Sequence, residues 1–198
     1  MKINIALALI AWIFLSSCSS VYAQDNDIGI SLIHPATPFY FLKTIRENLE
    51  LKFALTPRTK FFRQLEFATR RLRETKALIS KNEDLIPPTL EKYSSHIKTL
   101  PDKDLEDEEI QIRIKESLVV HLETLQKIYD QVSNLRAKIA IRASLNRIIQ
   151  RADVPVFAKL PICTFFAKEA SSAALNQTEK VVLEERAIKC HQSLSYLK

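Results

Sequence analysis

Residues 110–139 read IQIRIKESLVVHLETLQKIYDQVSNLRAKI, and apolar side chains recur in this stretch at every third or fourth position. This spacing is typical of an amphipathic α-helix, whose 3.6-residue turn brings such positions onto one face. The stripe consists of Ile110, Ile114, Leu118, Leu122, Leu125, Tyr129, Val132, Leu135 and Ile139. A single helix over residues 102–152 would be about 75 Å long, and the alternative is a break near Ser133-Asn134 or Ser144.

Prolines divide the rest of the chain into further helices. Thr37-Pro38 and Thr56-Pro57 each combine a residue favoured at a helix N-cap with proline at the first helical position. The predicted segments are helices over residues 38–54, 57–81 and 88–99, a linker over 153–161, and hairpin arms over 162–174 and 178–196. Amphipathic helices pack together to bury their apolar stripes. We therefore expect an all-α fold: an elongated helical bundle or long helical hairpin over residues 35–152, with a C-terminal helical hairpin over 153–198.

The chain of 198 residues contains one glycine, Gly29. Glycine supplies the positive φ of tight hairpin turns and the close backbone approach that phosphate-binding loops need. The composition therefore favours helices and excludes a P-loop or a dinucleotide-binding loop.

The first 23 residues resemble a signal peptide, because Lys2 precedes an apolar run over residues 3–15 and small polar residues follow. Cleavage after Ala23 is expected, and the protein is then periplasmic or extracellular. Alternatively, residues 15–18 form a lipobox, in which Cys18 would carry a lipid after cleavage before it. An uncleaved anchor is the third alternative, although the apolar run is shorter than the roughly 20 residues that span a bilayer.

Two cysteines remain beyond the leader, Cys163 and Cys190. Thiols usually pair in an oxidising compartment, and antiparallel hairpin arms would bring these two together. We predict a disulfide between them. The alternative, a metal or redox site with His191, lacks the C-x-x-C spacing.

A series of motifs lies within residues 35–97. Pro35-Ala36-Thr37-Pro38-Phe39-Tyr40-Phe41-Leu42-Lys43 is followed by Arg46-Glu47, Thr56-Pro57, Ala68-Thr69-Arg70-Arg71-Leu72-Arg73-Glu74 and Glu91-Lys92-Tyr93. This order resembles the bacterial domain-of-unknown-function family 5667. The resemblance implies an extracytoplasmic helical domain of undetermined activity.

The polar members of these motifs are Tyr40, Lys43, Arg71 and Glu74. Arg71 and Glu74 are three positions apart and are therefore neighbours on one helix face. We interpret the four residues as a structural network that clamps the first helix against the second; a ligand-binding role is the alternative.

The remaining charged groups have a simpler interpretation. An acidic group, Asp102, Asp104, Glu106, Asp107, Glu108 and Glu109, stands at a predicted helix start, and a basic group follows at the other end of that stretch: Arg136, Lys138, Arg142, Arg147 and Arg151. Both signs complement a helix dipole. The basic side chains of residues 58–76 form a solvated face, or a face that meets an anionic lipid or polymer.

The histidines His34, His96, His121 and His191 share no metal-ligand spacing. His121 lies beside the apolar stripe and is expected to be packed or at its edge. We therefore predict no catalytic, cofactor or metal site and no cofactor.

The leading hypothesis is a non-enzymatic helical interaction or structural module of the bacterial cell envelope. Its expected partner is an envelope protein or an anionic envelope surface, with membrane contact only through a lipid anchor and no nucleic acid. The alternative is a periplasmic ligand- or metal-sensing helical bundle. The oligomeric state stays open.

Overall fold

The computed structural model of the protein describes residues 28–101, 107–172 and 175–195. Over these residues the chain is helical and contains no strand, which confirms the all-α prediction. The elements are α2 (Tyr40–Lys52), α3 (Pro57–Ile79), the 3₁₀ turn η1 (Glu83–Leu85), α4 (Ile86–Lys98), α5 (Glu108–Gln131), α6 (Leu135–Ile149), α7 (Val156–Ala170) and α8 (Gln177–Ser195). The leader predicted over residues 1–23, with Cys18, lies outside the described residues.

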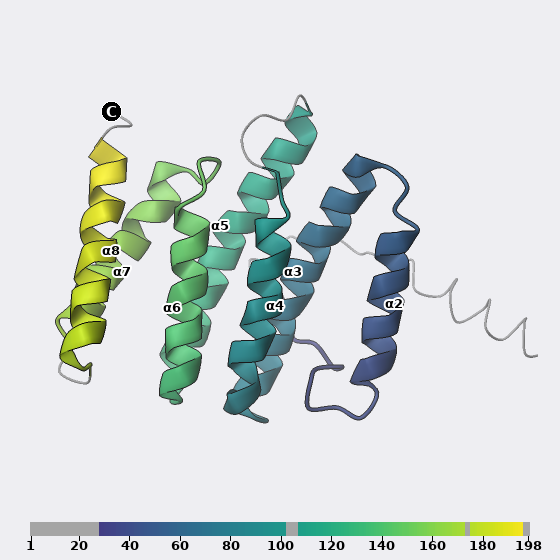
Figure 1. The fold of residues 1–198 in the computed structure, drawn as a ribbon, viewed down its shortest axis with the longest axis horizontal. Coiled ribbons are helices and arrows are strands. Elements are labelled where there is room, and N and C mark those ends of the chain that lie inside the picture. Colours follow the sequence, from purple (N-terminus) through teal and green to yellow (C-terminus); the bar gives the residue numbers. More distant parts are fainter. Residues whose placement is uncertain (1–27, 102–106, 173–174, 196–198) are drawn as a thin grey trace, which may run out of the picture.

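The helices stand side by side as an elongated bundle in two layers (Figure 1). α2, α4, α6 and α8 form one layer, and α3, α5 and α7 lie behind it. α3 packs against α2, α4 and α5; α6 packs against α4 and α5; and α7 pairs with α8 at the far end. The long-hairpin alternative is therefore wrong, and the C-terminal helix pair is present.

The long periodic stretch is broken at its first candidate position. Val132 has an extended backbone, and the Asn134 side chain caps α6 by accepting hydrogen bonds from the backbone N–H groups of Arg136 and Ala137. The carboxylate of Glu83 in η1 accepts hydrogen bonds from the backbone N–H groups of Ser133, at 3.1 Å, and Asn134, at 2.6 Å. A turn 50 residues away thus satisfies the donors that the break exposes.

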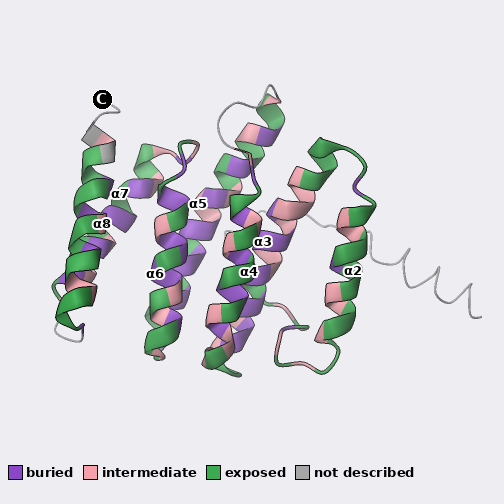
Figure 2. Ribbon diagram, viewed as in Figure 1, coloured by how far each residue is buried: buried purple, intermediate pink, exposed green. Residues whose placement is uncertain are grey.

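The core lies between the two layers, and the ribbon is coloured as buried mainly on the sides of the helices that face the other layer (Figure 2). The predicted stripe is buried from Ile110 to Val132. Leu135 and Ile139, which were expected to continue it, are exposed. The break resets the helical phase, so that α6 buries Ala137, Ile141, Leu145 and Ile148 in their place.

Helix boundaries follow the prolines only in part. Thr56 caps α3 as predicted, accepting a hydrogen bond from the Thr59 N–H at 3.1 Å. Thr37 does not cap α2; its hydroxyl donates to the His34 carbonyl, and the helix begins at Tyr40. The predicted linker over 153–161 is wrong beyond Pro155, because α7 begins at Val156 and contains Pro161. Pro161 and Phe157 are both exposed, so water can bond the carbonyl that proline leaves without a donor.

The predicted disulfide joins Cys163 in the middle of α7 to Cys190 in α8, with Cα atoms 5.5 Å apart. Because α7 begins earlier than predicted, Cys163 is central in its helix rather than near its start.

Two members of the predicted basic group are buried and bind specific partners rather than only the dipole of α6. The Arg142 guanidinium lies 3.5 Å from Glu169 and 3.8 Å from Glu179, where it links α6 to α7 and α8. Arg151 donates to the Pro101 carbonyl at 2.7 Å, to the Ile97 carbonyl in the last turn of α4 and to the Leu100 carbonyl just beyond it. Of the acidic group, Asp107 caps α5, while residues 102–106 lie outside the described residues.

Candidate functional site

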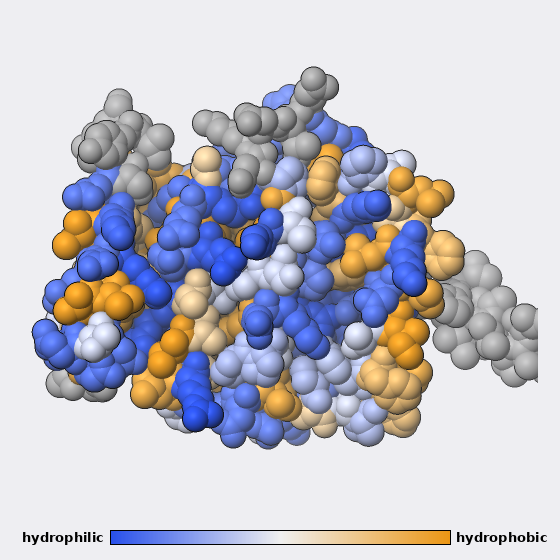
Figure 3. All heavy atoms as spheres, in the orientation of Figure 1, coloured by the Kyte–Doolittle hydropathy of each residue, from blue (hydrophilic) through white to orange (hydrophobic). Residues whose placement is uncertain are grey.

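Helix α2 faces the bundle with its polar side. Its only buried residue is Glu47, while Leu42, Ile45, Leu49 and the adjoining Phe53 are between 41 and 76% exposed. The expectation that amphipathic helices bury their apolar stripes is therefore wrong for α2. Figure 3 shows apolar surface along the side of the molecule that α2 occupies. None of the described helices is long and apolar enough to cross a bilayer.

The exposed apolar surface extends beyond the stripe to both flanks of α2. Of the 19 large apolar side chains that are exposed in the described residues, ten lie between residues 30 and 55. They are Ile30, Leu32, Ile33, Phe39, Phe41, Leu42, Ile45, Leu49, Phe53 and Leu55; we call them the α2 apolar face. A contiguous apolar surface on a folded domain usually marks an interaction site.

A buried polar network holds α2 in this orientation. Arg71 of α3, which is 2% exposed, pairs with Glu74 at 2.8 Å and with Glu47 of α2, and it donates to the Tyr40 hydroxyl. The Tyr40 hydroxyl in turn donates to Glu74 at 3.1 Å. Lys43 completes the set, with its ammonium 2.6 Å from Glu74. The structure thus brings together Tyr40, Lys43, Arg71 and Glu74, the four residues singled out from the sequence, and we call them with Glu47 the clamp.

The surroundings of Tyr40 in the clamp raise the pKa of its hydroxyl group. Burial, followed by the negative charge of Glu74, raises the pKa of Tyr40 well above its usual value. Tyr40 therefore stays a hydrogen-bond donor to Glu74 throughout the physiological range. A buried charge is tolerated only when it is paired, and both carboxylates of the clamp meet a cation.

Sequence reasoning missed two parts of this arrangement. Glu47 lies seven positions after Tyr40 and four after Lys43, which places all three on one helix face; that spacing was visible in the sequence. Arg70 adds a partly exposed layer, because its guanidinium lies 3.2 Å from Glu50 and 3.5 Å from Glu47. Its position, next to Arg71, did not distinguish it from a solvated cation.

The clamp also holds the segment before α2. Lys43 donates to the Ile33 carbonyl at 3.1 Å, and the Ser31 N–H donates to the Arg73 carbonyl at 3.2 Å. Residues 28–33 therefore lie along α3, next to α2.

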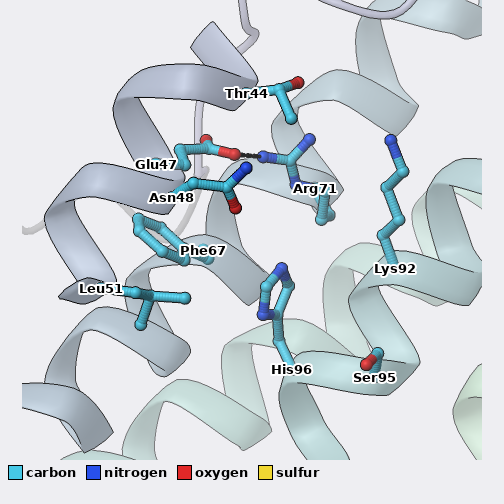
Figure 4. Close-up of a pocket in the computed structure, with 9 residues that line it drawn as sticks. All are labelled: Thr44, Glu47, Asn48, Leu51, Phe67, Arg71, Lys92, Ser95 and His96. Carbon is cyan, nitrogen blue, oxygen red and sulfur yellow. Dashed lines mark hydrogen bonds and ion pairs between the residues drawn. The ribbon is translucent and has the colours of Figure 1, made fainter.

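A pocket of about 230 Å³ separates α2 from α4. Its walls are Thr44, Glu47, Asn48 and Leu51 from α2, Phe67 and Arg71 from α3, and Lys92, Ser95 and His96 from α4. In Figure 4 the Arg71 guanidinium points toward Glu47, and the His96 ring extends from α4 into the space below them. The pocket lies on the clamp side of α2, opposite the apolar face.

His96 is neutral at physiological pH in this pocket. Burial, followed by the positive charges of Arg71 and Lys92, lowers the pKa of His96 to about 4. Its Nδ1 lies 2.6 Å from the Gln64 Oε1, so Nδ1 carries the proton and Nε2 is left as an acceptor.

The other histidines are not brought together into a site. His121 is buried between Thr69 and Tyr93, with ring nitrogens at 2.9 and 3.2 Å from their hydroxyls, as a packed histidine. Cys163 and Cys190 bind each other rather than a metal with His191. In the described part of the chain no group of three His, Cys, Asp or Glu side chains is placed to hold a metal ion.

The comparisons with known proteins place the clamp and the pocket within one family domain. No curated protein and no solved structure matches the chain. A family model does match, and it confirms the resemblance predicted over residues 35–97 while extending it through α5 to the first residue of α6. The match spans more than half of the 198 residues. The chain therefore belongs to the family described as Domain of unknown function (DUF5667), which covers residues 32–135.

Proposed function

We propose that this protein is an exported, non-enzymatic helical module of the bacterial cell envelope that docks on an anionic lipid surface through the α2 apolar face. The observation that carries the proposal is the reversed orientation of α2: the clamp fixes its polar side on α3 and leaves Leu42, Ile45 and Leu49 outward. A helix that lies in a membrane interface presents the same arrangement, with Leu and Phe toward the lipid.

The charges around this face favour an anionic surface. Between residues 28 and 63 the chain carries two acids, Glu47 and Glu50, and both face α3. Lys52 and Lys60 are exposed, and so is Arg46, although its guanidinium also pairs with Glu50 at 3.1 Å. Each exposed cation near an anionic bilayer contributes about 1 kcal/mol of attraction, and long cationic side chains can reach the headgroups while their stems stay apolar.

The same charges oppose the association of two copies through this face. Two copies joined at α2 would bring the cations of one copy toward those of the other, without exposed acids on either face to compensate them. Like charges in contact across an interface cost several kcal/mol. A lipid surface supplies the opposite sign.

The chain before α2 is compatible with this docking. Arg73 of α3 donates to the Ile28 carbonyl, so residue 28 lies on the α2–α3 side of the molecule. A lipid on Cys18 would be ten residues upstream, within reach of about 35 Å of extended chain. The sequence alone predicts membrane contact only through such an anchor; the α2 apolar face adds a second contact.

The absence of an enzymatic role is part of the proposal. Its support is that the charged groups of the clamp, Arg71, Glu47 and Glu74, form ion pairs with one another. A turnover reaction of the purified protein that one polar substitution abolishes would contradict this part.

Vesicle binding tests the docking. The exported chain carrying Cys18→Ser, which excludes a lipid at that position, is mixed with vesicles of phosphatidylcholine with or without phosphatidylglycerol and sedimented. We expect binding to the anionic vesicles that weakens with added salt. Ile45→Ser should weaken binding roughly tenfold, since it removes most of one buried aliphatic side chain from the contact.

A matched control separates the face from general surface hydrophobicity. Ile45 in α2 is 53% exposed and Ile188 in α8 is 56% exposed, so Ile188→Ser is the same substitution at a similar exposure on another helix. Equal effects of the two substitutions, or equal binding to neutral vesicles, would contradict the proposal. A dimer in sedimentation equilibrium that Ile45→Ser dissociates would assign the face to a second copy and overturn it.

A further inference from the structure

The pocket between α2, α3 and α4 contains buried polar atoms that make no hydrogen bond within the described part of the chain. Arg71 Nε and Glu47 Oε1 are buried and make no hydrogen bond. Both belong to clamp residues. Glu47 Oε1 has an ion-pair contact with Arg70 at 3.5 Å, whereas Arg71 Nε has neither a hydrogen bond nor an ion pair to any described residue, although both terminal nitrogens of Arg71 are paired. A buried donor left without a partner is destabilising, so the unpaired Arg71 Nε–H, beside a carboxylate oxygen that accepts no hydrogen bond, indicates that a further molecule bonds there.

Further groups at the rim point to the same space. The Lys92 ammonium lies 5.3 Å from the centre of the Tyr40 ring and has no acidic partner among the residues that the structure describes. The side chains of Asn48 and Ser95 make no hydrogen bond within the described part of the chain, and both line the pocket. His96 presents Nε2 as an acceptor from the opposite wall.

These groups sort into two opposite kinds. Arg71 Nε–H and the Lys92 ammonium are positively charged donors, which suit a carboxylate. Glu47 Oε1 and His96 Nε2 are acceptors, and one of them is negatively charged, which suits an ammonium. Phe67 and Leu51 add an apolar wall between them.

From this arrangement we infer that the pocket binds a free amino acid with an apolar side chain. Its carboxylate bonds to Arg71 Nε–H and Lys92, its ammonium bonds to Glu47 Oε1 and His96 Nε2, and its side chain lies against Phe67 and Leu51. The pocket volume of about 230 Å³ is that of roughly seven or eight water molecules, at roughly 30 Å³ each. A small molecule such as a free amino acid therefore fits inside it. A bound amino acid would touch all three helices and brace α2 against α4.

This site does not depend on docking at a membrane, because the pocket and the apolar face lie on opposite sides of α2. Neutral His96 is consistent with the ammonium partner, since its pKa of about 4 keeps the acceptor free at pH 7.

The test is a titration of the whole exported chain, labelled with ¹⁵N, against leucine in solution without lipid. Two probes of matched shape each lack one charge: leucine amide has no carboxylate, and 4-methylpentanoate has no ammonium. We expect leucine to shift the Arg71 Nε–H resonance and to slow amide exchange in α2. Each matched probe should bind at least roughly tenfold more weakly, the effect of losing one charge-assisted hydrogen bond.

Lys92→Ala tests the protein side, because Lys92 is exposed and contacts the clamp through the face of the Tyr40 ring rather than through an ion pair. It should weaken leucine binding roughly tenfold, while Lys98→Ala, at the exposed end of the same helix, should leave it unchanged. An absence of leucine-dependent shifts, equal binding of 4-methylpentanoate, or equal binding by the Lys92→Ala protein would each overturn the inference.

Discussion

Arg71 of α3 and Glu47 of α2 form a buried ion pair between residues 24 positions apart in the chain. This pair sets the orientation of α2. It gives the inner side of the helix charged groups that must stay paired away from water, and it leaves the apolar side chains outward. The clamp, rather than the local sequence of the helix, therefore determines which side of α2 faces the bundle.

The first prediction concerns this pair. Glu47→Leu leaves Arg71 with Glu74 as its remaining ion-pair partner, and Arg71→Leu leaves Glu47 with Arg70 at 3.5 Å. Each substitution removes one side of a buried pair and should destabilise the protein, by at most about 3–5 kcal/mol. In the double variant Lys43 and Tyr40 still bind Glu74, so no buried charge is left alone. We expect the double variant to be more stable than the Arg71→Leu protein, as measured by denaturant unfolding.

Amide exchange in α2 shows whether this loss is local. Within the described chain, the helix against which α2 mainly packs is α3. Exchange should therefore accelerate in α2 of the single variants well before it does in α5 and α6. Additive destabilisation in the double variant would show that the two side chains act independently.

The orientation of α2 also shows what the sequence could and could not specify. Helical periodicity identified α3, α5 and the C-terminal pair, because their apolar stripes meet other stripes in the core. The same periodicity in Leu42, Ile45 and Leu49 correctly predicted that α2 is a helix. It did not predict which side of α2 would pack against α3. That choice depends on Glu47 meeting Arg71, a tertiary contact that no local pattern reports.

The ends of the helices were predictable where the local sequence determines them. Thr56-Pro57 begins α3, because both the cap and the proline act within one turn. The start of α7 was missed because proline normally disrupts a helix interior, and Pro161 is tolerated on an exposed face. Arg151 was assigned to its own helix although it caps α4, which lies beside α6 only in the folded chain.

The disulfide gives the second prediction. Reduction of Cys163–Cys190, or Cys163→Ser with Cys190→Ser, should lower the free energy of unfolding by about 3 kcal/mol, because the bond closes a loop of 27 residues. Denaturant unfolding with and without dithiothreitol measures this difference. The double serine variant serves as the control, and a reductant effect of equal size in that variant would contradict the assignment.

The third prediction concerns the break between α5 and α6. Asn134→Ala removes the side chain that accepts from the N–H groups of Arg136 and Ala137 and should cost about 1 kcal/mol. Asn134→Asp keeps an acceptor at the cap but places it near Asp84, whose carboxylate accepts from the Asn134 amide at 2.8 Å. It should therefore recover only part of the loss. Thermal unfolding of the three proteins checks the order, and an Asn134→Ala protein as stable as the unchanged one would show that the Glu83 contacts alone fix the break.

The fourth prediction is a loss of stability in mild acid that originates at His121. Burial, followed by the positive charge of Arg73, lowers the pKa of His121 to about 3, whereas an unfolded histidine titrates near 6.5. Between these values the unfolded chain binds the proton and the folded chain does not. The contribution is therefore fully present above pH 6.5 and is lost as the pH falls toward 3.

For His121 alone this difference in pKa lowers the free energy of unfolding at pH 5 by about 2 kcal/mol relative to its value at high pH. His121→Gln keeps a donor and an acceptor for Thr69 and Tyr93 but cannot titrate, so it isolates the effect from that of His96. We expect the free energy of unfolding of the unchanged protein to fall more steeply than that of the variant between pH 7 and 5. Parallel curves would mean that the buried ring accepts a proton without cost, which its contacts with Thr69 and Tyr93 and its complete burial argue against.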